Sequence, residues 1–333
     1  MILLSTEYYA NPGSVPMWKY TYVYYMRYLK LSFFDMTILM IQPARFEFNN
    51  QTDFNSDFQR FVQQRNVHMS ALKEFERFTD NLTRHGIQLL IVPDSIEPHT
   101  PDSIFPNNWI STHEGGRVVL YPMYAPNIRE VRKPAVIDLI GSHFQIEEIV
   151  DYTFFEESGL YLEGNGSMVL DRINKIAYAC LSPRTNSGIF QLFCKQLGYE
   201  GIIFEAFDQR NYPIYHTNIM MCLADRFVLI NMDSVAQNYH RRLYESFEKT
   251  HKSVIPITFA QMNNFAGNIL QVPGYRNINH LVMSSSAFAS LTQIQLKILS
   301  SYNPIVHSSL VTIERHGRCS AGSMMAEIVL RCK

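Results

Sequence analysis

Three reactive side chains stand far apart in the chain, each within a short polar motif. Cys319 lies in IERHGRCSAGSMM, His216 in YHTN and Glu163 in LEGN. A thiolate is a strong nucleophile, an imidazole exchanges protons near neutral pH, and a carboxylate orients an imidazole or binds a substrate group. If the fold brings them together, these groups would perform covalent catalysis on an electrophilic carbon.

The residues around Cys319 suggest how its thiol would be activated. A free thiol has a pKa of about 8.5, and nearby positive charge lowers it. Arg315, His316 and Arg318 are close to Cys319 in the sequence and would supply that charge. The alternative is a buried structural cysteine, because free cysteines are commonly buried.

The five cysteines argue for free thiols in a reducing compartment. Their number is odd, no CxxC pair is present, and no Cys/His cluster has the spacing of a zinc site. Cys180 and Cys222 lie in apolar strand-like runs, Cys194 in a helical pattern and Cys332 near the end of the chain, which is typical of structural positions. We therefore expect a cytoplasmic protein without a metal site.

The composition is that of an ordinary globular enzyme or binding protein. The chain has 333 residues, of which 47% are hydrophobic and 18% charged, and its formal net charge is -1. No basic run long enough to follow a nucleic acid is present. Charged residues interrupt every long apolar stretch, so neither nucleic acid nor a membrane is an expected partner.

The first 35 residues differ from the rest. Aromatic residues crowd the stretch MWKYTYVYYMRYLKLSFFDM, and Lys19, Arg27 and Lys30 interrupt it. Met36 is followed directly by TILMIQP, which is typical of a buried strand. We interpret residues 1–35 as an extension outside the fold or a wrongly assigned start, and residues 36–333 as a single catalytic domain.

A repeating pattern runs through residues 36–333. Pairs of apolar runs around a polar turn, typical of hairpins, begin at Asn108, Gly166, Thr217 and Gly267, and a truncated copy begins at Gly322. The starts are 58, 51, 50 and 55 residues apart. A helix-like stretch and one more apolar run follow each complete hairpin. The helix-like stretches are residues 127–141, 187–201, 238–252 and 291–303.

Five strand–strand–helix–strand units would close most simply into a ring. No unit can bury its own apolar face, so neighbouring units must pack around a common axis. The strand after Met36 would complete the truncated fifth unit. The sequence therefore predicts an α/β fold in the form of a five-bladed α/β propeller.

Such a ring would place equivalent positions of the units at one site. A reactive or hydrogen-bonding residue stands at four of the five hairpin starts, and nothing comparable marks the fourth. The residues that we expect to converge at the axis are Asp102, Asn107, Asn108, Glu163, His216, Asn218 and Cys319.

The motifs LEG, HTN and RC, in that order, together with CLSPRTNSGIF, resemble the guanidine-modifying, or pentein, superfamily of five-bladed α/β propellers. This amidinotransferase superfamily includes arginine deiminases and dimethylarginine dimethylaminohydrolases. The segments MIQPARFEFNNQT, PDSIFPNNW and YPMYAPNIREVRKP most resemble its arginine deiminase-related citrulline utilisation hydrolases. The resemblance extends from about Met36 to the C-terminus.

The resemblance implies a role for each site residue. Cys319 would be the nucleophile, His216 the general acid and base, and Glu163 the carboxylate that orients the histidine or binds the reacting group. Arg184 in SPRTN would pair with the α-carboxylate of an amino-acid substrate, as suits a bidentate guanidinium. Asp102 lies in the loop that covers the substrate in relatives.

Three departures from the family pattern bear on the substrate. Relatives that act on a guanidinium carry acidic residues where this chain has Asn107-Asn108, Gly166 and Asn218. Loss of a carboxylate partner from a buried cation costs about 3–5 kcal/mol, on the order of a hundredfold or more in affinity. Asparagine amides suit a neutral ureido group, because they both donate and accept hydrogen bonds. The sequence predicts hydrolysis of citrulline to ornithine, ammonia and carbon dioxide, without a cofactor.

Other functions and states stay open from the sequence. An arginine deiminase, a dimethylarginine dimethylaminohydrolase or an amidinotransferase would act on a guanidinium. The same ring also occurs as a non-catalytic binding protein on the ribosome, which would not need reactive residues at matching positions. A papain-like protease is disfavoured, because its nucleophile precedes its histidine in the chain. The oligomeric state, including a homo-oligomer, is also open.

Overall fold

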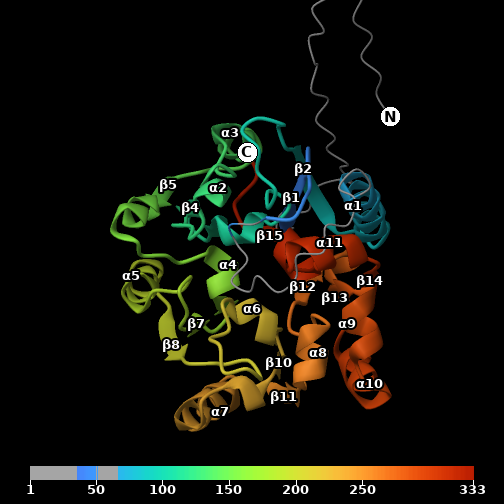
Figure 1. Ribbon diagram of the computed structural model, residues 1–333. Coiled ribbons are helices and arrows are strands. Elements are labelled where there is room, and N and C mark those ends of the chain that lie inside the picture. The colour runs from blue at the N-terminus through green and yellow to red at the C-terminus, as the bar shows by residue number, and fades with distance from the viewer. Residues whose placement is uncertain (1–35, 50, 52–66) are drawn as a thin grey trace, which may run out of the picture.

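The computed structural model describes residues 36–49, 51 and 67–333, and its strands form five three-stranded sheets (Figure 1). Figure 1 shows the sheets arranged as a ring, with the longer helices on the outside. The sequence prediction of an α/β propeller is confirmed. The proposed extension, residues 1–35, lies outside the described residues, so the division into domains stays a prediction.

Four of the five sheets repeat one plan. A hairpin supplies two antiparallel strands, and a third strand joins the second in parallel after a helical connection, as parallel pairing requires. The first four sheets along the chain are β3 (Ile110–His113), β4 (Arg117–Leu120) and β5 (Glu148–Asp151); β6 (Val169–Asp171), β7 (Ile176–Cys180) and β8 (Glu200–Phe204); β9 (Met221–Leu223), β10 (Phe227–Ile230) and β11 (Ser253–Pro256); and β12 (Leu270–Pro273), β13 (Asn279–Ser284) and β14 (Ile305–Ser308).

The fifth sheet joins the two ends of the described fold. Strand β1 (Thr37–Gln42) lies between β15 (Ala326–Ile328) and β2 (Gln88–Pro93). It pairs antiparallel with β15, where Thr37 is opposite Ile328, and parallel with β2. The predicted completion of the fifth unit by the strand after Met36 is therefore confirmed.

Helices cover the outer sides of the sheets where the pattern predicts them, with one difference. The predicted helix over 127–141 is two helices, α2 (Pro126–Arg129) and α3 (Pro134–His143). Pro134 lacks an N–H and disfavours helical geometry in the residue before it, so it begins a new helix. The other main helices are α1 (Val67–Arg84), α5 (Ser187–Leu197), α7 (His240–Lys249), α10 (Gln293–Tyr302) and α11 (Val311–Gly317).

Short helical turns lie before β3, β6, β9 and β15 and meet near the axis. They are η3 (Pro106–Asn108), α4 (Gly164–Ser167), α6 (Thr217–Met220) and η8 (Ala321–Met324). Turn α4 contacts η3 and α6, and η3 contacts η8. These axis turns carry or adjoin most of the predicted site residues. The remaining short helices are η4 (Thr153–Ser158), η5 (Met232–Ser234), η6 (Gln237–Tyr239), α8 (Phe259–Asn263), η7 (Tyr275–Asn277) and α9 (Ser285–Ser290).

The middle strands form a rigid base for these turns. Every residue of β7 and β10 is buried, because one face packs on the helices and the other on a neighbouring sheet. Helix α5 is held at both ends: the side chain of Asn186 accepts hydrogen bonds from two amides of its first turn, and Gly198 ends it with a positive φ of 75°. Within the described ranges, every helix is too short or too polar to cross a bilayer.

A buried ion pair joins two neighbouring sheets. Lys252 Nζ lies 3.0 Å from Asp171 Oδ2, and their side chains are 0% and 2% exposed. Asp171 ends β6, and Lys252 directly precedes β11. Lys252 also donates to the carbonyl oxygens of Ala224 and Asp225.

We expect Lys252→Met to lower the free energy of unfolding by about 3–5 kcal/mol, because it leaves the Asp171 carboxylate buried without its cation. Urea unfolding measures the change. Lys249→Met is the matched control: it removes a solvent-exposed ion pair with Glu200, and we expect a change below about 1 kcal/mol. Equal effects of the two substitutions would contradict a structural role for the buried pair.

Candidate active site

A cavity of about 370 Å³ brings together most of the predicted site residues. Five of the eight line it, namely Asp102, Asn108, Arg184, His216 and Cys319. A sixth, Glu163, is fully buried and forms a hydrogen bond with His216. Residues more than 200 positions apart in the chain thus meet at one place.

Glu163 is the anchor of this group. Its Oε2 lies 2.7 Å from His216 Nε2 and 3.2 Å from Arg184 Nη1, and its Oε1 accepts a 2.8 Å hydrogen bond from the backbone N–H of Tyr124. Burial alone would raise the pKa of Glu163, but the charge of Arg184 and the hydrogen bond with His216 outweigh it and hold the pKa at about 2. Glu163 is therefore a carboxylate at neutral pH.

The contact with Glu163 decides which ring nitrogen of His216 is free. A carboxylate only accepts hydrogen bonds, so Nε2 must carry the proton. Burial lowers the pKa of His216, although Glu163 opposes this effect, so the ring is neutral at pH 7. In the neutral ring Nδ1 is then a proton acceptor, and it is buried with no hydrogen-bond partner among the described residues. Nδ1 is therefore the ring nitrogen that could accept a proton during a reaction.

Cys319 follows the end of helix α11. The chain leaves the helix through Gly317 and then Arg318, which has a left-handed φ of 54°. A Cβ on Gly317 would lie 2.6 Å from the Phe105 ring, so a glycine is needed there. The hydroxyl of Tyr215 donates a 3.1 Å hydrogen bond to the carbonyl of Arg318, which ties this turn to the segment that carries His216.

The thiol of Cys319 is protonated in the protein alone. Burial raises its pKa to about 12, and the negative charges of Asp102 and Glu163 act in the same direction. A hydrogen bond with Ser323 and the charge of Arg184 only partly oppose this effect. The expectation that neighbouring cations activate the thiol is therefore wrong, because desolvation of the thiolate exceeds their influence.

Asp102 adds a second carboxyl group to the cavity. Burial raises its pKa to about 6, while a hydrogen bond from Asn49 and the charge of Arg184 oppose the rise. The donor is Asn49 Nδ2, 2.6 Å from Asp102 Oδ2. Within residues 36–49, 51 and 67–333, Asp102 forms no ion pair. At neutral pH the cavity thus contains a carboxylate without a cation in direct contact.

Arg184 is partly engaged by the protein itself. Besides its contact with Glu163, its guanidinium lies over the rings of Tyr215 and Tyr124, at 5.0 and 5.8 Å from the ring centroids. These aromatic contacts fix the plane of the guanidinium. Its predicted role, to bind a substrate carboxylate, stays a prediction that is consistent with its place in the cavity lining.

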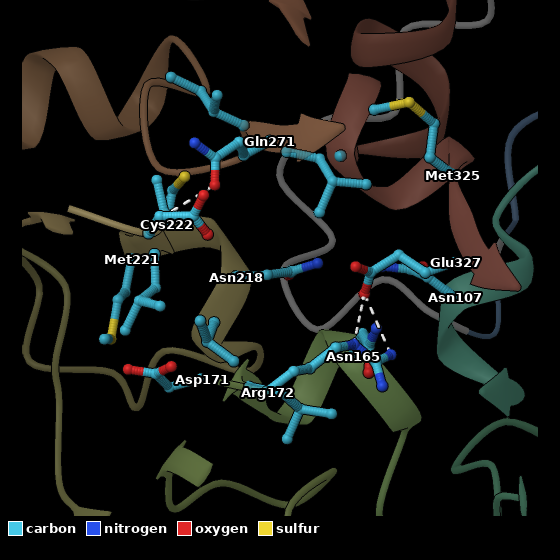
Figure 2. Close-up of a pocket in the computed structure, with 18 of the residues that line it drawn as sticks. Asn107, Asn165, Asp171, Arg172, Asn218, Met221, Cys222, Gln271, Met325 and Glu327 are labelled. Atoms are coloured by element: carbon cyan, nitrogen blue, oxygen red, sulfur yellow. Dashed lines mark hydrogen bonds and ion pairs between the residues drawn. The ribbon is translucent and has the colours of Figure 1, made fainter. Parts of the chain in front are cut away.

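The structure places Asn107 and Asn218 elsewhere. They line a second cavity of about 250 Å³, together with Asn165, Arg172 and Glu327 (Figure 2). The expectation that all predicted residues converge on one pocket is wrong for these two. Asn107 and Asn108 are adjacent in one helical turn, so their side chains leave the backbone in different directions. Asn218 follows His216 by two residues at another short turn, so these two side chains also point in different directions.

Sequence reasoning missed several residues that shape the site. Tyr124 and Tyr215 contact Arg184, and Ser323 lowers the pKa of the Cys319 thiol. Asn268, at the fourth hairpin start, donates a hydrogen bond to Ser323. The sequence carried a signal for Asn268, because Asn268 in GNIL occupies the position of Asn218 in TNIM. The fourth unit therefore also has a polar residue at its hairpin start.

Gly166 explains one departure from the family pattern. A Cβ there would lie 2.5 Å from Asn108 Oδ1 and 2.8 Å from His216 Cε1. Distances under 3.0 Å are not found for real Cβ atoms, so a larger residue requires His216 or Asn108 to move. Glycine is the residue that lets the imidazole lie against this turn.

We expect Gly166→Ala to lower kcat by tenfold or more while the protein stays folded, because the new methyl group displaces the imidazole from its position. Steady-state kinetics and circular dichroism measure the two properties. Gly141→Ala is the control, since a Cβ on this helical glycine meets Ile146 at an ordinary 3.5 Å. An unchanged kcat in Gly166→Ala would contradict the placement of His216.

Comparisons with known proteins agree with this fold. Residues 42–330 match the family model described as "N,N dimethylarginine dimethylhydrolase, eukaryotic". The N-terminal domain of ArgZ, an arginine dihydrolase from the ornithine–ammonia cycle in cyanobacteria, has a TM-score of 0.67 at 18% identity over 89% of this chain and 99% of that domain. A dimethylarginine dimethylaminohydrolase has a TM-score of 0.62 at 12% identity over 89% of this chain and 100% of its own.

Unliganded AgrE gives a TM-score of 0.68 at 18% identity, over 90% of this chain but 40% of the AgrE chain. No curated protein matches the sequence. At such identities the structural matches show the fold, whereas the family model covers most of the chain. The predicted guanidine-modifying superfamily is thus confirmed, and the chain belongs to the family of N,N-dimethylarginine dimethylhydrolases, hydrolases that act on carbon–nitrogen bonds other than peptide bonds.

Proposed function

We propose that the protein hydrolyses the guanidinium group of an arginine-like amino acid through a covalent intermediate on Cys319. One observation carries the proposal: a thiol, an imidazole paired with a buried carboxylate, and a second carboxylate meet at one cavity. The family match and the arginine dihydrolase named among the structural neighbours support a guanidino substrate.

The charge of the cavity favours a cation over a neutral group. Asp102 is a half-buried carboxylate without an ion-pair partner among the described residues, and it would bind a guanidinium directly. A cation beside Cys319 would also lower the pKa of the thiol, which is about 12 in the protein alone. A neutral ureido group supplies neither effect.

Citrulline is the second candidate, because Asn108 faces the cavity. Its Oδ1 is buried without a hydrogen-bond partner among the described residues and would accept an N–H of a ureido or a guanidinium group. The preference for citrulline inferred from the sequence rested on several neutral amides. Two of these, Asn107 and Asn218, line the other cavity, so the support for a neutral substrate is smaller.

The reaction follows from the assigned groups. The substrate cation lowers the thiol pKa, and His216 Nδ1 accepts the proton as the sulfur attacks the guanidinium carbon. The resulting imidazolium is stabilised by Glu163 and returns the proton to the departing nitrogen, which leaves as ammonia or an alkylamine. Water then attacks the amidino–sulfur carbon, again with His216 as base, and releases the ureido product and the free thiol.

The substrate is tested with purified protein and arginine, methylated arginines, agmatine and citrulline, by measuring ammonia, alkylamine, citrulline and ornithine. We expect a guanidino amino acid to be consumed fastest. Cys319→Ala should abolish turnover, and Cys332→Ser, which changes an exposed cysteine, should not. An adduct on another residue, such as Ser323, or turnover by Cys319→Ala would overturn the assignment of the nucleophile; faster consumption of citrulline would favour the second candidate.

The pH dependence of kcat/KM tests the role of Asp102. Its pKa is raised to about 6, so the carboxylate is protonated as the pH falls through 6, and binding of a cation should weaken there. We expect kcat/KM for the guanidino substrate to fall below pH 6. Asp102→Asn should reduce it about a hundredfold or more at neutral pH and remove that part of the pH dependence. A profile that keeps the same acid limb in Asp102→Asn would contradict this role.

A further inference from the structure

Asn49 joins the segment after β1 to the carboxylate of the catalytic cavity. Asn49 is 3% exposed, and its Nδ2 donates the 2.6 Å hydrogen bond to Asp102 Oδ2. Asp102 lines the cavity, and within residues 36–49, 51 and 67–333 its Oδ1 forms no hydrogen bond. The amide therefore occupies one oxygen of the carboxylate and leaves the other for a substrate.

A backbone contact fixes the orientation of the Asn49 amide. Its Oδ1 accepts the backbone N–H of Gln51 at 3.0 Å, and a backbone N–H only donates. The NH₂ end of the amide is therefore the end that faces Asp102. An ionised carboxylate only accepts hydrogen bonds, so this orientation favours the charged form of Asp102.

Asn127, in helix α2, holds Asn49 in this orientation. The two side-chain amides pair reciprocally: Asn127 Nδ2 donates to Asn49 Oδ1 at 2.7 Å, and Asn49 Nδ2 donates to Asn127 Oδ1 at 3.3 Å. The backbone N–H of Asn127 also donates to Gln51 Oε1 at 3.0 Å. The NH₂ group of Asn49 thus has two acceptors, one on Asp102 and one on Asn127.

The segment that carries Asn49 is also anchored without this amide. Phe46 is buried in the hydrophobic core, and its backbone N–H donates to His68 Nδ1 at 3.2 Å. Strand β1, which precedes the segment, is the middle strand of the fifth sheet. A substitution of Asn49 should therefore remove the hydrogen bond to Asp102 without releasing the segment.

We propose that Asn49 is a positioning residue for the reaction, which holds Oδ2 of Asp102 so that Oδ1 is presented to the guanidinium of the substrate, and that Asn127 orients the Asn49 amide. A proton on Asp102 would have to bind Oδ1, because Oδ2 faces a donor, and it would occupy the oxygen that the substrate needs. The inference rests on the proposed function, since it requires a cationic group at Asp102.

The hydrogen bond from Asn49 opposes the effect of burial on Asp102. Burial raises the pKa of this carboxyl group to about 6, Asn49 and the charge of Arg184 lower the pKa, and the charge of Glu163 raises it. Loss of the Asn49 donor should therefore raise the pKa of Asp102 further. The other titratable or charged residues that line the cavity are Asp208, Tyr212, Tyr215, His216, Arg318 and Cys319.

The titration of Asp102 tests the inference without a substrate. Aspartate is isotopically labelled at its carboxyl carbon, the signal that Asp102→Asn removes is assigned to Asp102, and its chemical shift is followed against pH by NMR. We expect Asn49→Ala to raise the pKa of Asp102 by about one to two pH units, as for loss of a hydrogen bond to a charged group. Asn127→Ala should cause a smaller shift in the same direction.

Asn81→Ala is the matched control. It removes another side-chain amide, which donates to the carbonyl of His307 at 3.0 Å, and should leave the titration of Asp102 unchanged.

Kinetics with a guanidino substrate separate this role from a structural one. Asn49→Ala should move the acid limb of kcat/KM to higher pH by the same amount and lower kcat/KM at pH 7 by about two- to tenfold, with recovery at higher pH. In the Asp102→Asn background, Asn49→Ala should have little further effect, because the carboxylate through which it acts is absent. A merely structural role would instead add its loss to that of Asp102→Asn.

An unchanged titration of Asp102 in Asn49→Ala, or an equal shift in Asn81→Ala, would overturn the inference. Losses of kcat/KM that add fully in the double variant would overturn it as well. Each of these results leaves the proposed function standing if the wild-type protein turns over a guanidino substrate. Conversely, the expected titration shift in a protein that turns over no guanidino substrate would contradict the proposed function and keep the link between Asn49 and Asp102.

Discussion

The buried carboxylate of Glu163 connects the ring to its chemistry. Its partners come from three units: the Tyr124 amide follows β4, Arg184 follows β7 and His216 precedes α6. A fully buried charge is tolerated only when its oxygens are satisfied, so these contacts must form together as the units pack. The same contacts place the proton of His216 on Nε2 and leave Nδ1 as a base. The catalytic pair is thus complete only when these three units pack together.

The axis turns divide the centre of the ring into two environments. Adjacent residues of a turn project in different directions, so Asn108 lines the catalytic cavity and Asn107 lines the second one. Ser323, Asn218 and Asn268 come from three units and are joined by hydrogen bonds. The second cavity is bordered by the Asp171–Lys252 and Arg172–Glu327 ion pairs. In the catalytic cavity, Asp102 forms no ion pair with the residues that the structure describes.

The carboxylates near Cys319 have a cost for the nucleophile. Asp102 and Glu163 raise the pKa of the Cys319 thiol beyond the effect of burial, so the protein alone holds a neutral thiol and a neutral imidazole in one cavity. A neutral thiol is the less reactive form, because the thiolate is the nucleophile. A cationic substrate would neutralise the carboxylates and favour the thiolate at the same moment. In the proposed reaction, activation of the nucleophile would therefore depend on the charge of the group that it attacks.

The periodic features of this protein were readable from residue order. Hairpin spacing, helix-like stretches and the strand after Met36 predicted five units and their closure, because apolar periodicity and turn residues act locally. The motifs around Glu163, His216 and Cys319 likewise indicated a shared site and a superfamily. The break at Pro134 was also a local signal, which a helix drawn over 127–141 overlooked.

Side-chain direction and electrostatic environment were not readable in this way. Whether Asn107 or Asn108 lines the catalytic cavity depends on how one short turn packs against its neighbours. A shift of that turn by one residue would exchange the cavities that the two side chains line. The basic residues beside Cys319 in sequence suggested a lowered pKa, whereas burial and carboxylates from distant units raise it. Neighbours in sequence say little about charge in a folded site, because desolvation and through-space contacts arise only when the five units close.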